Sequence, residues 1–139
     1  MLQFSFPNQR LPALPSPLLS FDSRKLGSTR IIKLVEEIGK VGTTKILLLG
    51  NNKITDSAIP AIVQHLILNP KVFLEELDLG GNNLTNDGAQ QLISALQQRN
   101  TLNKLFLKGN PEISAENLKG ISTLMAAGKE KNKNTTENP

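Results

Sequence analysis

Residues 74–96 read LEELDLGGNNLTNDGAQQLISAL, and this stretch decides the fold. It opens with apolar and polar residues alternating around Leu77 and Leu79, a period of two that predicts a strand. Glycines and asparagines follow, which tolerate left-handed backbone and turn the chain. The apolar positions then take helical spacing, at Ala89, Leu92, Ile93 and Leu96. The stretch therefore predicts a strand, a turn and a helix.

The same pattern recurs along the chain. Residues 102–124 read LNKLFLKGNPEISAENLKGISTL, residues 44–66 read TKILLLGNNKITDSAIPAIVQHL, and a weaker copy at residues 16–38 reads SPLLSFDSRKLGSTRIIKLVEEI. Aligned on one position, the four copies place there Arg24, Asn52, Asn82 and Asn110, separated by 28, 30 and 28 residues. One such unit cannot bury both its strand leucines and its helix stripe, so the repetition predicts a stack of units that share this surface.

The repeated pattern LxxLxL-xx-N-xL resembles the leucine-rich repeat family, and at about 28 residues per repeat it is most similar to the ribonuclease-inhibitor-like subfamily. The resemblance implies an α/β solenoid, a short right-handed horseshoe arc with parallel strands on the concave face and helices on the convex face. Three departures weaken the pattern. Arg24 replaces the asparagine of the first repeat, Thr44 replaces the first leucine of the second, and residues 111–113 place one extra residue after Asn110.

The repeats also set the expected domain boundaries. The polar residues at the C-terminal end predict disorder, because they offer no apolar surface to bury. No polar cap follows the last helix, so that helix either closes the solenoid itself or is covered by another chain, which allows self-association. The expected parts are an irregular N-terminal arm or cap at 1–15, the leucine-rich repeat domain at 16–128 with repeats 16–43, 44–73, 74–101 and 102–128, and a disordered polar tail at 129–139.

The recurring asparagines are expected to be structural. We predict that they lie inside the solenoid and use their side-chain amides to bond the turning backbone of adjacent repeats. The residues of this ladder are Asn52, Asn82 and Asn110.

Composition excludes much familiar chemistry. The chain has 139 residues, a formal net charge of +4, no cysteine and one histidine, His65. We therefore expect no disulfide framework, no metal site and no cofactor, and the absence of cysteine fits a reducing, cytoplasmic location. Glu76 and Asp78 would project to one face of a strand, but no nucleophile or third group accompanies them, so we expect no enzyme activity.

The resemblance implies that a protein partner binds the concave sheet face. Strand side chains that point away from the core form columns across the repeats, and some of these side chains are apolar. Such a patch is typical of an interface, although short parallel strands take apolar residues in any case and the N-terminal arm could cover them. The expected binding residues are Ile46, Leu48, Glu76, Asp78, Lys104, Phe106 and Lys108.

Two finer hypotheses and one further class stay open at this point. The chain could be a bacterial effector that engages host proteins. Alternatively, it could regulate a small GTPase, since the same repeat subfamily includes the Ran GTPase-activating proteins. Nucleic-acid binding through the lysines of residues 129–133 is disfavoured, because no aromatic platform accompanies them. No small-molecule substrate and no membrane span is expected.

Overall fold

The computed structural model describes residues 17–137 of the chain, and the side chains of residues 17–126. The expected N-terminal arm at residues 1–15 lies outside the described residues. Strands and helical segments alternate in the order β1 (Leu18–Ser20), α1 (Gly27–Val41), β2 (Ile46–Leu48), η1 (Asp56–Ala58), α2 (Ile59–Ile62), η2 (Val63–Ile67), β3 (Glu76–Asp78), α3 (Asn86–Gln98), β4 (Lys104–Phe106) and α4 (Ala115–Glu137).

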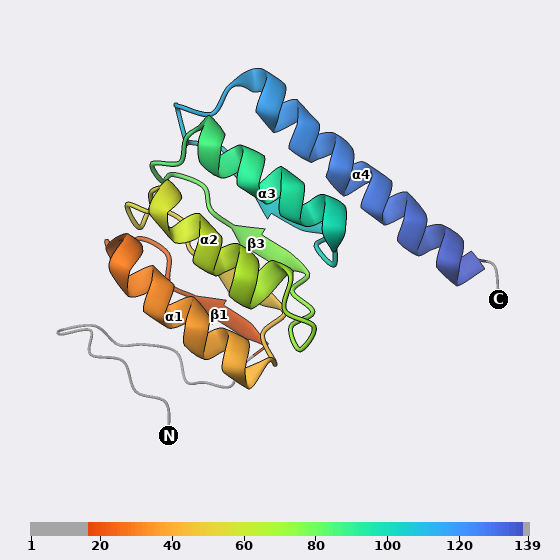
Figure 1. Ribbon diagram of the computed structural model, residues 1–139, viewed down its shortest axis with the longest axis horizontal. Helices are drawn as coiled ribbons and strands as arrows, with labels where there is room; N and C mark the ends of the chain where they lie inside the picture. Colours follow the sequence, from red (N-terminus) through yellow and green to blue (C-terminus); the bar gives the residue numbers. More distant parts are fainter. Residues whose placement is uncertain (1–16, 138–139) are drawn as a thin grey trace.

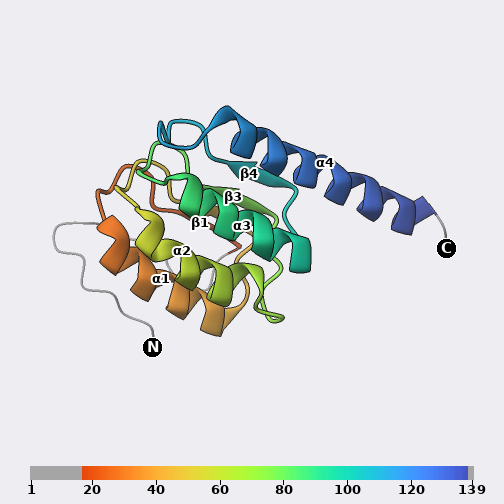
Figure 2. The same ribbon diagram turned by 45° about the horizontal axis from the view of Figure 1, so that its top comes forward.

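The four strands form one parallel sheet in the order β1-β2-β3-β4. Figure 1 and Figure 2 show the helices lying side by side on one face of this sheet. Leu18 pairs with Ile46, Ile46 with Glu76, and Glu76 with Lys104. This is the register that the repeat spacing predicts, and the α/β solenoid is confirmed.

The core lies between the sheet and the helices. Leu47 and Leu77, the central residues of β2 and β3, are fully buried. The predicted helix stripes face them, and Ile31, Ile62 and Leu92 are fully buried as well. Burial of each such side chain stabilises the fold by roughly 1.5–3 kcal/mol. The shared core therefore makes each repeat depend on its neighbours.

The asparagine side chains lie inside this stack and connect repeats. The Asn82 Oδ1 accepts the backbone N–H groups of Asn52 at 2.8 Å and Ile54 at 3.0 Å. Its Nδ2 donates to the carbonyls of Leu49 at 3.1 Å and Leu79 at 2.9 Å. A single buried amide thus satisfies polar groups of its own repeat and of the preceding one.

The first repeat lacks this amide for a structural reason. The backbone N–H of Arg24 donates to the Asn52 Oδ1 at 3.1 Å, so Arg24 is bonded by the ladder of the next repeat. Each asparagine serves the repeat before it, and the described residues contain no repeat before Arg24. One of the two roles of the amide is therefore absent at this position, whereas its bonds within its own repeat remain in the later repeats.

The helical segment of the second repeat departs from the expected continuous helix. Its spacing of apolar residues is that of the other repeats, yet it divides into η1, α2 and η2, and η2 has π-helical hydrogen bonds from Val63 to Ile67. Pro60 in the first turn of α2 has no N–H to give. Thr55 precedes this segment, yet its side chain makes no capping bond and contacts the Ser28 Oγ at 3.0 Å.

The last helix is longer than the sequence predicts. α4 continues to Glu137, through most of the segment 129–139 for which the polar composition predicts disorder. Figure 1 shows α4 extending well beyond the helices beside it. The side chains after Ala126 lie outside the described residues, and the disorder of 129–139 stays a prediction.

Candidate binding face

The inner sheet face consists of the side chains of β2, β3 and β4 that point away from the helices, namely Ile46, Leu48, Glu76, Asp78, Lys104 and Phe106. Phe106 is 44% exposed, and Leu48 and Asp78, its neighbours in the same column, are partly exposed. Apolar and charged groups therefore stand side by side on three consecutive strands. Aromatic residues in such a setting often supply much of the binding energy of an interface.

Charge on this face is only weakly paired. The Lys104 Nζ lies 4.0 Å from the Glu76 Oε1, and the Lys104 side chain is largely exposed. An exposed pair at this distance contributes little to stability. Both groups can therefore turn to a partner at small cost.

A cavity of about 500 Å³ opens where the strands end, at one rim of the inner sheet face. We call it the rim cavity. Two of the residues at its base are glycines that leave no room for a side chain. A Cβ on Gly50 would lie 3.0 Å from the Asp22 Oδ1, and a Cβ on Gly80 would lie 2.9 Å from the Lys108 carbonyl oxygen. The rim cavity is lined by Asp22, Ser23, Gly50, Asn51, Asp78, Gly80, Gly81, Phe106 and Lys108.

Two carboxylates in the rim cavity are held in place by backbone. The Gly50 N–H donates to the Asp22 Oδ1 at 2.7 Å, and the Gly80 N–H donates to the Asp78 Oδ1 at 2.8 Å. Each bond fixes one carboxylate through its Oδ1, and the Oδ2 of the same carboxylate takes no part in that bond. The two acids are therefore oriented before a partner arrives, which lowers the entropic cost of binding.

The structure places the predicted binding residues on adjoining elements. Six of them share the inner sheet face, and Lys108 lines the rim cavity together with Asp78 and Phe106. The sequence prediction omitted Asp22, which precedes Gly50 and Gly80 in its column. The repeat register could have found it, because an acid stands there where the next two repeats have glycine.

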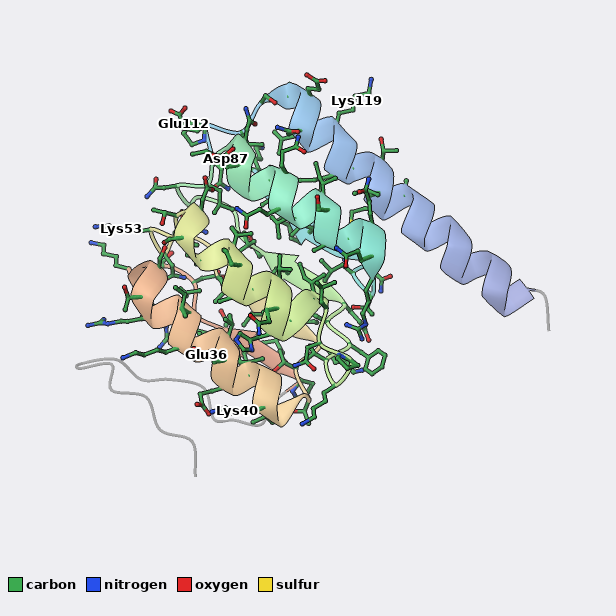
Figure 3. The ribbon with its side chains drawn as sticks, viewed as in Figure 1. Glu36, Lys40, Lys53, Asp87, Glu112 and Lys119 are labelled. Atoms are coloured by element: carbon green, nitrogen blue, oxygen red, sulfur yellow. The ribbon has the colours of Figure 1, made fainter. Side chains whose placement is uncertain are left out.

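The outer face has a different character. Figure 3 shows charged side chains of both signs projecting from the helices and loops, among them Glu36 and Lys40 on α1, Asp87 on α3 and Lys119 on α4. Interspersed charges of this kind keep a surface soluble and are not typical of a specific interface.

A second polar ladder on the loops was not foreseen. The Asp56 carboxylate accepts the Thr85 N–H at 2.9 Å and the hydroxyl of the same threonine. One repeat later, the Asn86 Oδ1 accepts the Ser114 N–H at 2.8 Å. Ser28, Asp56 and Asn86 are separated by 28 and 30 residues, which is the repeat spacing, so the sequence alone could have indicated this ladder. These contacts tie neighbouring loops together and are structural.

Within residues 17–126, no group of three or more histidine, cysteine, aspartate or glutamate side chains could hold a metal ion. His65 is partly buried on η2, and its backbone carbonyl accepts the Asn69 Nδ2 at 2.9 Å. No helix in the described part of the chain is both long and apolar enough to span a bilayer.

Known proteins agree with this architecture. The chain is 35% identical to the ribonuclease inhibitor of Sus scrofa over 81 residues, which is 58% of this chain and 17% of that protein. It superposes on the actin-binding site 2 structure of leiomodin-1 with a TM-score of 0.65 at 18% identity, covering 87% of this chain and 86% of the other. The tropomodulin C-terminal domain of Caenorhabditis elegans gives a TM-score of 0.59 at 15% identity, covering 90% and 91%. No family model matches the sequence.

These likenesses, together with the register and the amide ladder, define the class of protein. The chain is a leucine-rich repeat solenoid. More particularly, its fold is ribonuclease-inhibitor-like, and the chain spans about one sixth of the ribonuclease inhibitor that it resembles.

Proposed function

We propose that this protein is a non-catalytic interaction module that binds a protein partner through the inner sheet face. The observation that carries the proposal is the exposed ring of Phe106, which lines the rim cavity and shares a column of the sheet with partly exposed Leu48 two strands away. A partner would bury the two apolar side chains and pair with Asp78 and Lys108. Burial of aromatic surface supplies affinity, and the charges at the rim supply specificity.

The finer hypotheses remain within this proposal. A cytoplasmic location fits the absence of cysteine, and a bacterial effector role is one setting for such a module. Regulation of a small GTPase would need polar residues on particular loops, and two of the described loop residues, Asp56 and Asn86, bond the neighbouring repeat instead. The plain interaction module is therefore favoured.

Two single variants test the proposed face by affinity capture. Leu48→Asp places a charge at an apolar position of the face, and Asp78→Asn removes a charge while keeping an oxygen for the Gly80 N–H. We expect each to reduce capture of the partner from cell lysate by roughly tenfold or more, which corresponds to about 1.4 kcal/mol. Purified ribonuclease A and actin are defined probes, because the names of the similar proteins mention ribonuclease and actin.

Gln91→Asp is the matched control, since Gln91 is exposed on α3 and faces away from the sheet. Circular dichroism checks that each variant keeps its mixed helix and strand signal. If folded Leu48→Asp still captured the partner fully and Gln91→Asp did not, the binding site would lie on the helices and not on the sheet.

A further inference from the structure

Among the residues that the structure describes, the last repeat has backbone donors without the acceptors that earlier repeats have. In those repeats the N–H groups of Phe21, Leu49 and Leu79 donate to a carbonyl of the following repeat, at 2.8, 2.9 and 2.8 Å. Leu107 holds the same position and is only 4% exposed. No strand follows it within the described residues. A nearly buried N–H without an acceptor is costly, so something is expected to cover it.

The matching acceptor is open as well. The carbonyls of Pro17, Lys45 and Glu75 each accept two N–H groups from the following repeat, at 2.7 to 3.1 Å. Asn103 is the corresponding residue of the last repeat, and β4 is the end strand of the sheet. One edge of β4 therefore presents a donor at Leu107 and an acceptor at Asn103.

Leu105 adds a donor and an acceptor between these two. The Lys104 N–H donates toward β3 at 3.1 Å, and the Phe106 carbonyl accepts from β3 at 2.8 Å. Successive backbone groups point to opposite sides of a strand, so the N–H and C=O of Leu105 face away from β3. They belong to an unpaired edge of the kind that joins sheets together.

Most of the side chains beside this edge are apolar. Leu105 is partly exposed, whereas Leu47 and Leu77 at the same position are fully buried. A cavity of about 320 Å³ lies between β4 and α4, at the place where a further repeat would stack. It is lined by Asn103, Lys104, Leu105, Phe106, Ile121, Ser122, Met125 and Ala126.

The described chain does not fill this place itself. β4 begins a certain number of residues after the start of α3. The same separation, counted from the start of α4, leads to Lys133, where a further strand would begin. That residue is instead part of α4, which ends at Glu137. Figure 2 shows α4 running straight past the ends of the neighbouring helices. Within residues 17–137, no strand occupies this place.

We propose that a second copy of this chain covers the edge, with the two β4 strands antiparallel about a two-fold axis at Leu105. The open groups are then self-complementary. Leu105 exchanges N–H and C=O with Leu105 of the second copy, and the Leu107 N–H meets the Asn103 carbonyl of the second copy, each bond being made twice by symmetry. The joined edges form one eight-stranded sheet, and the faces of α4 beside the cavity close over it.

The charges fit this arrangement. Antiparallel pairing about Leu105 places Lys104 opposite Phe106 of the second copy, so no lysine faces a lysine. A lysine beside an aromatic ring is favourable. Two-fold pairing also consumes the open edge of both copies, whereas head-to-tail stacking would leave an edge free and continue into a filament.

A single cysteine tests the two-fold axis, because the native chain has no cysteine. Opposed residues of a hydrogen-bonded antiparallel pair have Cα atoms about 5.5 Å apart, within the span of a disulfide. Under mild oxidation, Leu105→Cys is expected to form a disulfide-linked dimer, and Ser94→Cys, on the exposed side of α3, is expected to form little. Sedimentation equilibrium of the native chain should give the mass of two chains.

A second variant avoids any effect of Leu105 on folding. Ser122 is exposed on α4 and lines the cavity. Ser122→Arg is expected to weaken self-association by roughly tenfold or more, because it places a cation in an apolar contact, while Ser94→Arg leaves self-association unchanged. A native chain with the mass of one chain across a dilution series, or equal disulfide yields at residues 105 and 94, overturns the proposal. Neither result decides whether the inner sheet face captures a partner, because Leu48→Asp tests that face at β2, away from the edge of β4.

Discussion

At the scale of single residues, the buried amides decide whether repeats stay in register. Asn52, Asn82 and Asn110 are 0%, 2% and 4% exposed, and each bonds backbone groups of two repeats. Without such an amide, the turn that follows each strand would leave several buried carbonyls and N–H groups without partners. The asparagine is therefore a structural requirement of the repeat rather than part of a binding site.

Asn82→Ala is expected to lower the free energy of unfolding by about 2–4 kcal/mol, because it leaves the N–H groups of Asn52 and Ile54 buried and unsatisfied. Urea denaturation followed by circular dichroism measures the change. Asn83→Ala is the neighbouring control, since Asn83 is exposed. Equal midpoints for the two variants would show that the amide ladder contributes nothing to stability.

At the scale of elements, two helical glycines differ in what surrounds them. A Cβ on Gly39 in α1 would lie 2.8 Å from the His65 carbonyl oxygen and 3.2 Å from the Asn69 Nδ2. The absence of a side chain there lets α1 approach the second repeat closely. A Cβ on Gly120 in α4 would meet only the Ile93 Cδ1, at an ordinary contact distance of 3.8 Å.

A glycine-to-alanine substitution should therefore change the free energy of unfolding in opposite directions in the two helices. Gly39→Ala is expected to destabilise the fold by about 1–3 kcal/mol, because the clash is with backbone. Gly120→Ala is expected to stabilise it by up to about 1 kcal/mol, because alanine favours the helix and nothing opposes it. Thermal unfolding of both variants measures the difference. Stabilisation of both would mean that α1 does not approach η2 as described.

The elements also show what periodicity can and cannot predict. Repetition at 28 and 30 residues was enough to place Ile46, Glu76 and Lys104 in one column, because a stacked fold converts sequence spacing into spatial register. The division of the second helical segment near Pro60 and Val63 was missed, since π-helical bonding depends on packing against neighbouring helices.

The candidate site was predictable in part for the same reason. The repeat register identifies which side chains share the inner sheet face, so Leu48 and Phe106 could be chosen from the sequence. It does not reveal which polar side chain turns back to the backbone. Asp22 lies in the column of Gly50 and was passed over, although its carboxylate accepts the Gly50 N–H and lines the rim cavity.

At the scale of the whole molecule, the solenoid divides its surface by role. The helices present mixed charges on the outer face, the sheet presents exposed apolar side chains on the inner face, and the final repeat presents an open edge. Stability resides in contacts between neighbouring repeats, so the inner side chains are free to be used for binding. The inner sheet face and the edge of β4 adjoin at Lys104 and Phe106, which belong to both.

The most direct measurement places a photoreactive p-benzoylphenylalanine at Phe106 on the inner sheet face and, in a separate variant, at Gln91 on α3. Both positions are exposed, so both variants should fold. After irradiation in cell lysate, mass spectrometry of the cross-linked bands should identify one partner at residue 106 and none of it at residue 91. The same partner cross-linked from residue 91 and absent from residue 106 would contradict binding through the sheet.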